Sequence, residues 1–148
     1  MSAHSYDQDF YAWTREQADL LRAGNFTALD ADHLAEELDS MGASERQQLS
    51  NRLKVLMAHM LKWQYQPHLQ SRSWSATLKE QRLSIQDLLD DNPSLRTILD
   101  QRITKAYRLA RLLAVRETNL EERTFPEQCP YTWEQINDES YYPGAVDG

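Results

Sequence analysis

Apolar side chains recur at intervals of three and four residues along most of the chain, which is the repeat of a helix face turned toward a core. The longest stripe falls in residues 44–65, where the spacing alternates between four and three through Leu49, Leu53, Leu56, Met60 and Trp63. No segment carries the pattern of a strand. The sequence therefore predicts an all-α chain of 148 residues, folded as a single-domain helical bundle of about five helices.

Residues that begin and end helices separate these stripes from one another. The predicted helices are 7–23, 31–41, 44–65, 71–91 and 93–117. Gly24 and Gly42 each follow a stripe, at the position where a left-handed residue commonly ends a helix. Thr132 and Gln135 form the pair of a capping box, so we expect one short C-terminal helical turn and then a tail at 144–148.

The composition is that of an ordinary globular protein. Apolar residues make up 41% and charged residues 26%, and four Gly with five Pro favour long helices. No run has the length of an apolar membrane helix, and the first ten residues lack the basic and apolar parts of an export signal. The single Cys129 excludes an intramolecular disulfide and suits a reducing compartment. We therefore expect a cytoplasmic protein without a membrane partner.

The charges are distributed unevenly along the chain. Residues 1–44 carry two basic and nine acidic side chains, a net charge of −7. Residues 45–123 carry fourteen basic and nine acidic side chains, a net charge of +5, and residues 124–148 carry five acidic ones and no basic one. The middle of the chain is thus basic and both ends are acidic, which bears on what each part can bind.

Several short strings of the sequence match a known pattern in the same order. They are YDQDFYAW from Tyr6, HLAEELDSMG from His33, LMAHMLKWQYQP from Leu56, RSW from Arg72 and FPEQCPYT from Phe125. Together they resemble the bacterial family named domain of unknown function twenty-nine, over about residues 6–143. The resemblance implies an all-helical fold and a bacterial source. It implies no activity, because it brings no established catalytic or binding residues.

Polar side chains interrupt the predicted core faces, where burial of a charge is costly unless it is paired. The candidates for a site are Glu37, Arg52, His59, Arg82 and Glu117. We expect one of two arrangements for four of them, Glu37, His59, Arg82 and Glu117. They converge in a polar pocket between helices, or they form ion pairs and hydrogen bonds that fix how the helices meet. Both interpretations are open at this point.

Arg52 and His59 also match the loose Arg-x(4–6)-His pattern of the helical ribonucleases called HEPN. In those enzymes such a pair resembles a set for general acid-base catalysis and phosphate binding, usually at a dimer interface. A chain with four His and this many Arg is expected to contain about one such match by chance. The ribonuclease interpretation is therefore an alternative hypothesis.

We expect no metal site and no cofactor. His33 lies three and four residues before Glu36 and Glu37, but di-iron bundles need a Glu-x-x-His unit on each of two helices, and here the order is reversed and occurs once. Cys129 has no base close to it in sequence and is expected to be a small packing residue. With four Gly, the chain has no phosphate-binding loop.

Residues 93–117 carry four basic residues at intervals of three, opposite their apolar face: Arg102, Lys105, Arg108 and Arg111. Such a stripe is able to bind phosphates, but it is also typical of a solvated face or of one that pairs with acidic parts of its own chain. Nucleic acid is consequently a less favoured partner.

The leading hypothesis is a non-catalytic helical interaction or regulatory protein that binds a protein partner or itself, because the core pattern is complete and no catalytic set exceeds chance. The first alternative is the metal-independent ribonuclease that uses Arg52 and His59. A weaker alternative is binding of a small anionic ligand between helices by Arg82.

Overall fold

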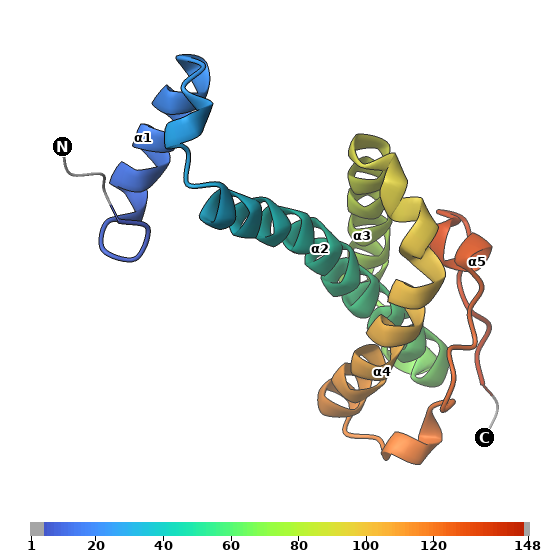
Figure 1. The fold of residues 1–148 in the computed structure, drawn as a ribbon. Coiled ribbons are helices and arrows are strands. Elements are labelled where there is room, and N and C mark those ends of the chain that lie inside the picture. The colour runs from blue at the N-terminus through green and yellow to red at the C-terminus, as the bar shows by residue number, and fades with distance from the viewer. Residues whose placement is uncertain (1–4, 147–148) are drawn as a thin grey trace. The chain divides into compact units, whose positions relative to one another are not determined.

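The chain is all-α in its computed structural model, which describes residues 5–146 (Figure 1). The five α-helices of this part are α1 (Phe10–Arg22), α2 (Ala31–Tyr65), α3 (Arg72–Asp91), α4 (Leu99–Thr118) and α5 (Trp133–Asn137). Four 3₁₀ segments lie between them: η1 (Phe26–Ala28), η2 (Pro67–Leu69), η3 (Pro93–Ile98) and η4 (Glu122–Thr124). Residues 5–146 contain no strand, as the apolar periodicity predicts.

The chain divides into two compact units, residues 1–44 and residues 45–148. Unit 1 holds α1, η1 and the start of α2, and unit 2 holds the rest of α2 and everything that follows. The folding of both units as one domain stays a prediction.

Unit 1 is a small hairpin of helices. The side chain of Asp9 accepts a hydrogen bond from the Ala12 amide and so begins α1. Gly24, with φ of +71°, reverses the chain after this helix, as the sequence predicts. Asp30 then caps α2 through the His33 amide, at 3.4 Å. Trp13 and Gln17 are the buried residues of α1, so unit 1 has a small core.

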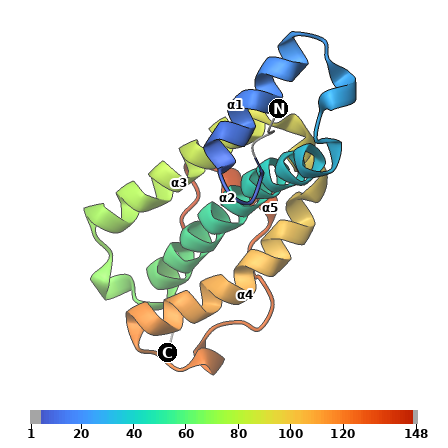
Figure 2. The same cartoon turned by 60° about the vertical axis from the view of Figure 1, so that its left-hand side comes forward.

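Unit 2 contains the main hydrophobic core. Figures 1 and 2 show α3 and α4 beside the second half of α2. Residues with almost no solvent exposure line these helices at the predicted spacings, among them Leu49, Leu53 and Leu56 of α2, Leu78, Ile85 and Leu89 of α3, and Tyr107, Ala110 and Ala114 of α4. The long stripe of the central helix therefore faces a real core, as predicted.

The chain after α4 returns along α2 and closes the core of unit 2. Phe125, Tyr131 and Ile136 of this segment are buried in the cluster. The Tyr131 hydroxyl donates to Oε1 of Gln64 at 2.7 Å, and the Val146 amide donates to the Gln64 carbonyl at 3.0 Å. The predicted capping box of Thr132 and Gln135 is present and begins α5. The region predicted as a short turn is thus packed onto the core, and one backbone hydrogen bond holds residue 146 of the exposed tail.

The predicted boundary at Gly42 is wrong. α2 continues without a break from Ala31 to Tyr65, through Gly42 and through the expected start of the next helix at residue 44. A glycine inside a helix costs only about 1 kcal/mol relative to alanine, and strong helix-forming sequence on both sides outweighs that cost. The Pro93 segment is also different from expectation, since it forms η3 before α4 begins at Leu99.

The predicted core stripe of residues 31–41 is largely uncovered. Leu38 is 66% exposed and Met41 is 64% exposed, although their spacing with Leu34 is that of a buried face. Periodicity identifies a helix face that is apolar, but it does not identify what covers that face. The uncovered face belongs to unit 1, where it forms one side of a groove.

Candidate interaction site

A groove of about 270 Å³ runs along the apolar faces of α1 and the first turns of α2, within unit 1. Its lining residues are Phe10, Trp13, Thr14, Gln17, Ala18, Leu21, Leu34, Glu37, Leu38 and Met41. On each helix they follow the spacing of three and four that normally meets another helix. The groove therefore has the pattern of a helix-packing surface with one side left open.

The rim of the groove exposes large apolar side chains. Phe10 and Leu21 are each 47% exposed on α1, and Leu38 and Met41 are still more exposed on α2. Single exposed apolar residues are common, whereas several that gather along one groove mark a surface that binds something. Burying them would remove substantial apolar area from water.

Two buried side chains in the floor of the groove make hydrogen bonds to Asp30. Trp13 is 2% exposed and Gln17 is 5% exposed. The Trp13 indole donates to Oδ2 of Asp30 at 3.0 Å, and Oε1 of Gln17 accepts the Asp30 amide at 2.8 Å. Asp30 thus joins α1 to the start of α2 with both its backbone and its side chain.

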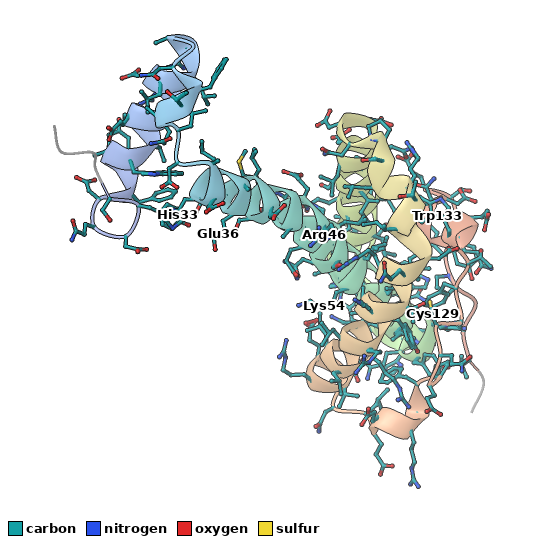
Figure 3. The ribbon with its side chains drawn as sticks, viewed as in Figure 1. His33, Glu36, Arg46, Lys54, Cys129 and Trp133 are labelled. Carbon is teal, nitrogen blue, oxygen red and sulfur yellow. The ribbon has the colours of Figure 1, made fainter. Side chains whose placement is uncertain are left out.

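His33 strengthens the same junction. Its Nδ1 donates to Oδ2 of Asp30 at 2.7 Å, and the Tyr6 ring stacks on the imidazole with centroids 4.1 Å apart. This hydrogen bond raises the pKa of His33 and lowers that of Asp30. Figure 3 shows His33 and Glu36 on the first turns of α2, where His33 Nε2 lies 4.0 Å from Oε2 of Glu36. Within residues 5–146 no group of three or more His, Cys, Asp and Glu side chains is placed to hold a metal ion.

Glu37 is the sequence-predicted candidate that lines the groove. Its Oε1 accepts a hydrogen bond from the Tyr6 hydroxyl, which raises the pKa of Tyr6 to about 12. Among the described residues no Lys, Arg or His lies within ion-pair distance of the Glu37 carboxylate. The groove therefore contains one carboxylate, among side chains that are mostly apolar.

Arg52 and His59 lie two turns apart on α2, in unit 2. Arg52 Nη1 donates to Oε1 of Gln81 at 3.4 Å, beside a hollow of about 280 Å³ that Arg52 and Gln81 help to line. His59 Nδ1 donates to the Val55 carbonyl at 2.9 Å, and burial lowers the pKa of His59. His59 does not line that hollow.

Glu117 forms an ion pair with Lys62, a partner that the sequence did not identify. Lys62 Nζ lies 3.0 Å from Oε1 of Glu117 and 4.8 Å from the centre of the Trp74 ring. The Lys62 side chain is only 10% exposed, while that of Glu117 is 35% exposed. The contact ties α2, α3 and α4 together, so Glu117 has a structural partner. The one signal for Lys62 in the sequence is its place inside the apolar run of the central helix.

Arg82 is 2% exposed and holds the C-terminal segment. Its Nε donates to the Ile136 carbonyl at 2.9 Å and its Nη2 donates to the Gln135 carbonyl at 3.2 Å. Burial lowers the pKa of Arg82. The Arg82 guanidinium thus caps two carbonyls of α5. The ion pair between Lys62 and Glu117 is a separate contact that does not include Arg82.

The predicted basic stripe divides between two roles. Lys105 and Arg108 are exposed, whereas Arg111 Nη2 donates to the Phe125 carbonyl at 3.0 Å and its Nη1 lies 3.5 Å from Oε1 of Glu122. Arg102 is half-buried. Arg111 therefore supports the fold around α4 through these two contacts.

Arg108 and Arg111 also line the larger hollow of unit 2, about 650 Å³, together with two carboxylates, Glu122 and Glu127. Cys129 lies on its wall, with Sγ 3.7 Å from Met57 Sδ and 3.4 Å from the Tyr131 carbonyl. Burial raises the pKa of the Cys129 thiol, which makes it a poor nucleophile. The lining of this hollow thus carries two positive and two negative side chains.

No described helix combines the length and apolar character that crossing a membrane requires. No curated protein and no solved structure matched the chain. The model of one family, described as domain of unknown function DUF29, matches residues 5–142 of the 148. The resemblance of the short strings is thereby confirmed over nearly the whole length, and the chain belongs to the DUF29 family.

Proposed function

We propose that this protein is a non-catalytic interaction protein whose unit 1 takes up a helical segment of a partner in the groove between α1 and α2. The observation that carries the proposal is the exposure of Leu38 and Met41, at 66% and 64%, on a helix face with the spacing of a packed core. Two helices with open apolar stripes offer a third helix the packing that a bundle provides.

The state of the polar residues supports a binding role over a catalytic one. Arg82 and Glu117 are occupied by contacts within the fold, and the buried atoms beneath the groove are hydrogen-bonded. Such a floor is preorganised, so binding does not have to order it first. We also propose that this role is carried out in the cytoplasm of a bacterium, because a lone thiol suits a reducing compartment and the resemblance of the short strings implies a bacterial source.

The proposal is tested with a neutral amphipathic peptide of about 15 residues, long enough for a four-turn helix with Leu on one face and Gln on the other. Isothermal titration calorimetry with the full chain is expected to show one saturable site. The double variant Leu38→Ser/Met41→Ser is expected to lose this binding, because it removes the apolar rim of the groove.

A matched control comes from α4, where Leu109 and Leu112 are 55% and 50% exposed. The double variant Leu109→Ser/Leu112→Ser is expected to bind the peptide as the unchanged chain does. All four positions are exposed, so thermal melts of both variants are expected to match the parent closely. Absence of saturable binding, or equal loss in both variants, would contradict the proposal.

A ribonuclease that uses Arg52 and His59 is the second candidate. The state of His59 favours it. The Nδ1–H group of His59 donates to the Val55 carbonyl, and burial lowers the pKa of the imidazole. Nε2 is then unprotonated near neutral pH and is able to act as a base. His59→Ala would then abolish cleavage of single-stranded RNA, and His68→Ala, an exposed histidine in η2, would not. An unchanged chain that cleaves no RNA removes this candidate.

A further inference from the structure

We infer that the segment bound in the groove is an amphipathic helix with a Lys or Arg at the border of its apolar face that reaches Glu37. This inference rests on the proposed function and adds the chemistry of the partner. It follows from the length of the groove, from the state of the Glu37 carboxylate and from the charge of unit 1.

The dimensions of the groove suit a short helix. The α1 side extends from Phe10 to Leu21, about 16 Å at the rise of an α-helix. Along α2, Leu34, Leu38 and Met41 follow the four-three spacing of a coiled-coil seam. A helix of three to four turns would meet both stripes, and an extended strand would leave its backbone groups without partners on these helices.

Glu37 makes a purely apolar occupant unfavourable. Its only hydrogen bond from a described residue comes from the Tyr6 hydroxyl, so the remaining lone pairs of the carboxylate depend on water. A helix lying in the groove would displace that water, and a carboxylate without a replacement donor is costly to cover. A Lys or Arg at the matching position supplies both hydrogen-bond donors and a positive charge, and no residue that lines the groove carries a positive charge.

The charge of unit 1 favours a basic occupant and disfavours a second copy of the same groove. Residues 1–44 carry two basic and nine acidic side chains, a net charge of −7, and all eleven lie among the described residues. Pairing of two such units would bring together two surfaces that each have a net charge of −7, and the repulsion between them opposes association. A helix with Lys or Arg around its apolar face is attracted by the same field.

The inference is tested with three peptides that share one Leu face and differ only in their polar residues, which are Lys, Gln or Glu. Titration of the full chain is expected to give the order Lys, Gln, Glu from strongest to weakest. Glu37→Gln keeps an acceptor for Tyr6 and removes one charge. It is expected to reduce the preference for Lys over Gln about tenfold, as for a hydrogen-bonded charge pair.

Asp39→Asn is the matched control, because Asp39 is an exposed acid on the same helix outside the groove and its substitution removes the same charge. It is expected to change the preference less than about twofold, since exposed charges are screened by salt. Equal weakening in Glu37→Gln and Asp39→Asn would overturn the role of Glu37.

The remaining outcomes separate this inference from the proposed function. If the three peptides bind equally and Leu38→Ser abolishes binding, the groove takes a helix and the basic partner is wrong. If sedimentation velocity shows a dimer that Leu38→Ser dissociates, the occupant is a second copy and the basic partner is again wrong. If no peptide binds and the chain stays monomeric, both proposals fall.

Discussion

Replacement of Arg82 by Met tests whether this buried residue is structural. Arg82 donates two hydrogen bonds to the carbonyls of Gln135 and Ile136, and hydrogen bonds from a charged donor contribute about 1.5–3 kcal/mol each. Met fills much of the same volume and removes the cost of burying a guanidinium. The Ile136 carbonyl would lose its partner in a part of α5 where the residue has no exposure. We expect Arg82→Met to lower the free energy of unfolding of unit 2 by about 3 kcal/mol.

Urea unfolding followed by far-UV circular dichroism measures this loss, and hydrogen exchange locates it. The amides of α5 are expected to exchange faster in Arg82→Met, because α5 is held against α3 by the lost hydrogen bonds.

Arg96→Met is the control, since the Arg96 side chain is 46% exposed in its ion pair with Asp90. It is expected to change stability by no more than about 0.5 kcal/mol. A loss below about 1 kcal/mol for Arg82→Met, or unchanged exchange in α5, would refute the structural assignment and return Arg82 to the candidates for ligand binding.

Three further outcomes are expected. Gly42→Ala should raise the free energy of unfolding by about 0.5–1 kcal/mol in urea, because alanine favours a helix more than glycine does and the added Cβ meets nothing within 4 Å. A destabilised variant would contradict this. Unit 1 should be most protected from hydrogen exchange between the ordinary pKa values of Asp30 and His33, 3.8 and 6.5. Because folding raises the His33 pKa, the stability that His33 contributes is lost as pH rises through its pKa in the folded protein. Because folding lowers the Asp30 pKa, the stability that Asp30 contributes is lost as pH falls through its pKa in the folded protein. A His33→Gln variant that still loses protection at alkaline pH would refute this. Lys62→Met should lower the free energy of unfolding by at most about 1 kcal/mol, because the partly exposed Glu117 carboxylate regains water. Lys62→Ala should lower it by about 2 kcal/mol or more, because packing is lost as well. Urea unfolding of the two variants measures the difference, and equal losses would contradict the prediction.

Local signals in the sequence predict local structure well. Gly24 and the pair of Thr132 with Gln135 act through residues no more than a few positions away. Gly24 follows the end of a helix as predicted, and the pair begins one as predicted. The Gly42 boundary failed because the preference of one residue was outweighed by the helix-forming residues on both sides.

The site was only partly predictable. The apolar spacing of Leu38 is visible in the sequence, but its exposure depends on which elements pack against it, and no local pattern carries that. The Glu37 partner is 31 positions away, and the Lys62 partner is 55 positions away. Contacts at such separations follow from tertiary packing. The sequence therefore predicted which polar residues lie on apolar helix faces, but it did not predict their partners.

The burial of Cys129 makes the chain ready for site-specific labelling. It is the only cysteine, it is half-buried, and its raised pKa keeps the thiol protonated near neutral pH. A thiol introduced at an exposed position beside the groove, such as Asp39, would react with a maleimide dye far faster than Cys129. A fluorophore could therefore report directly on what enters the groove, without prior removal of the native cysteine.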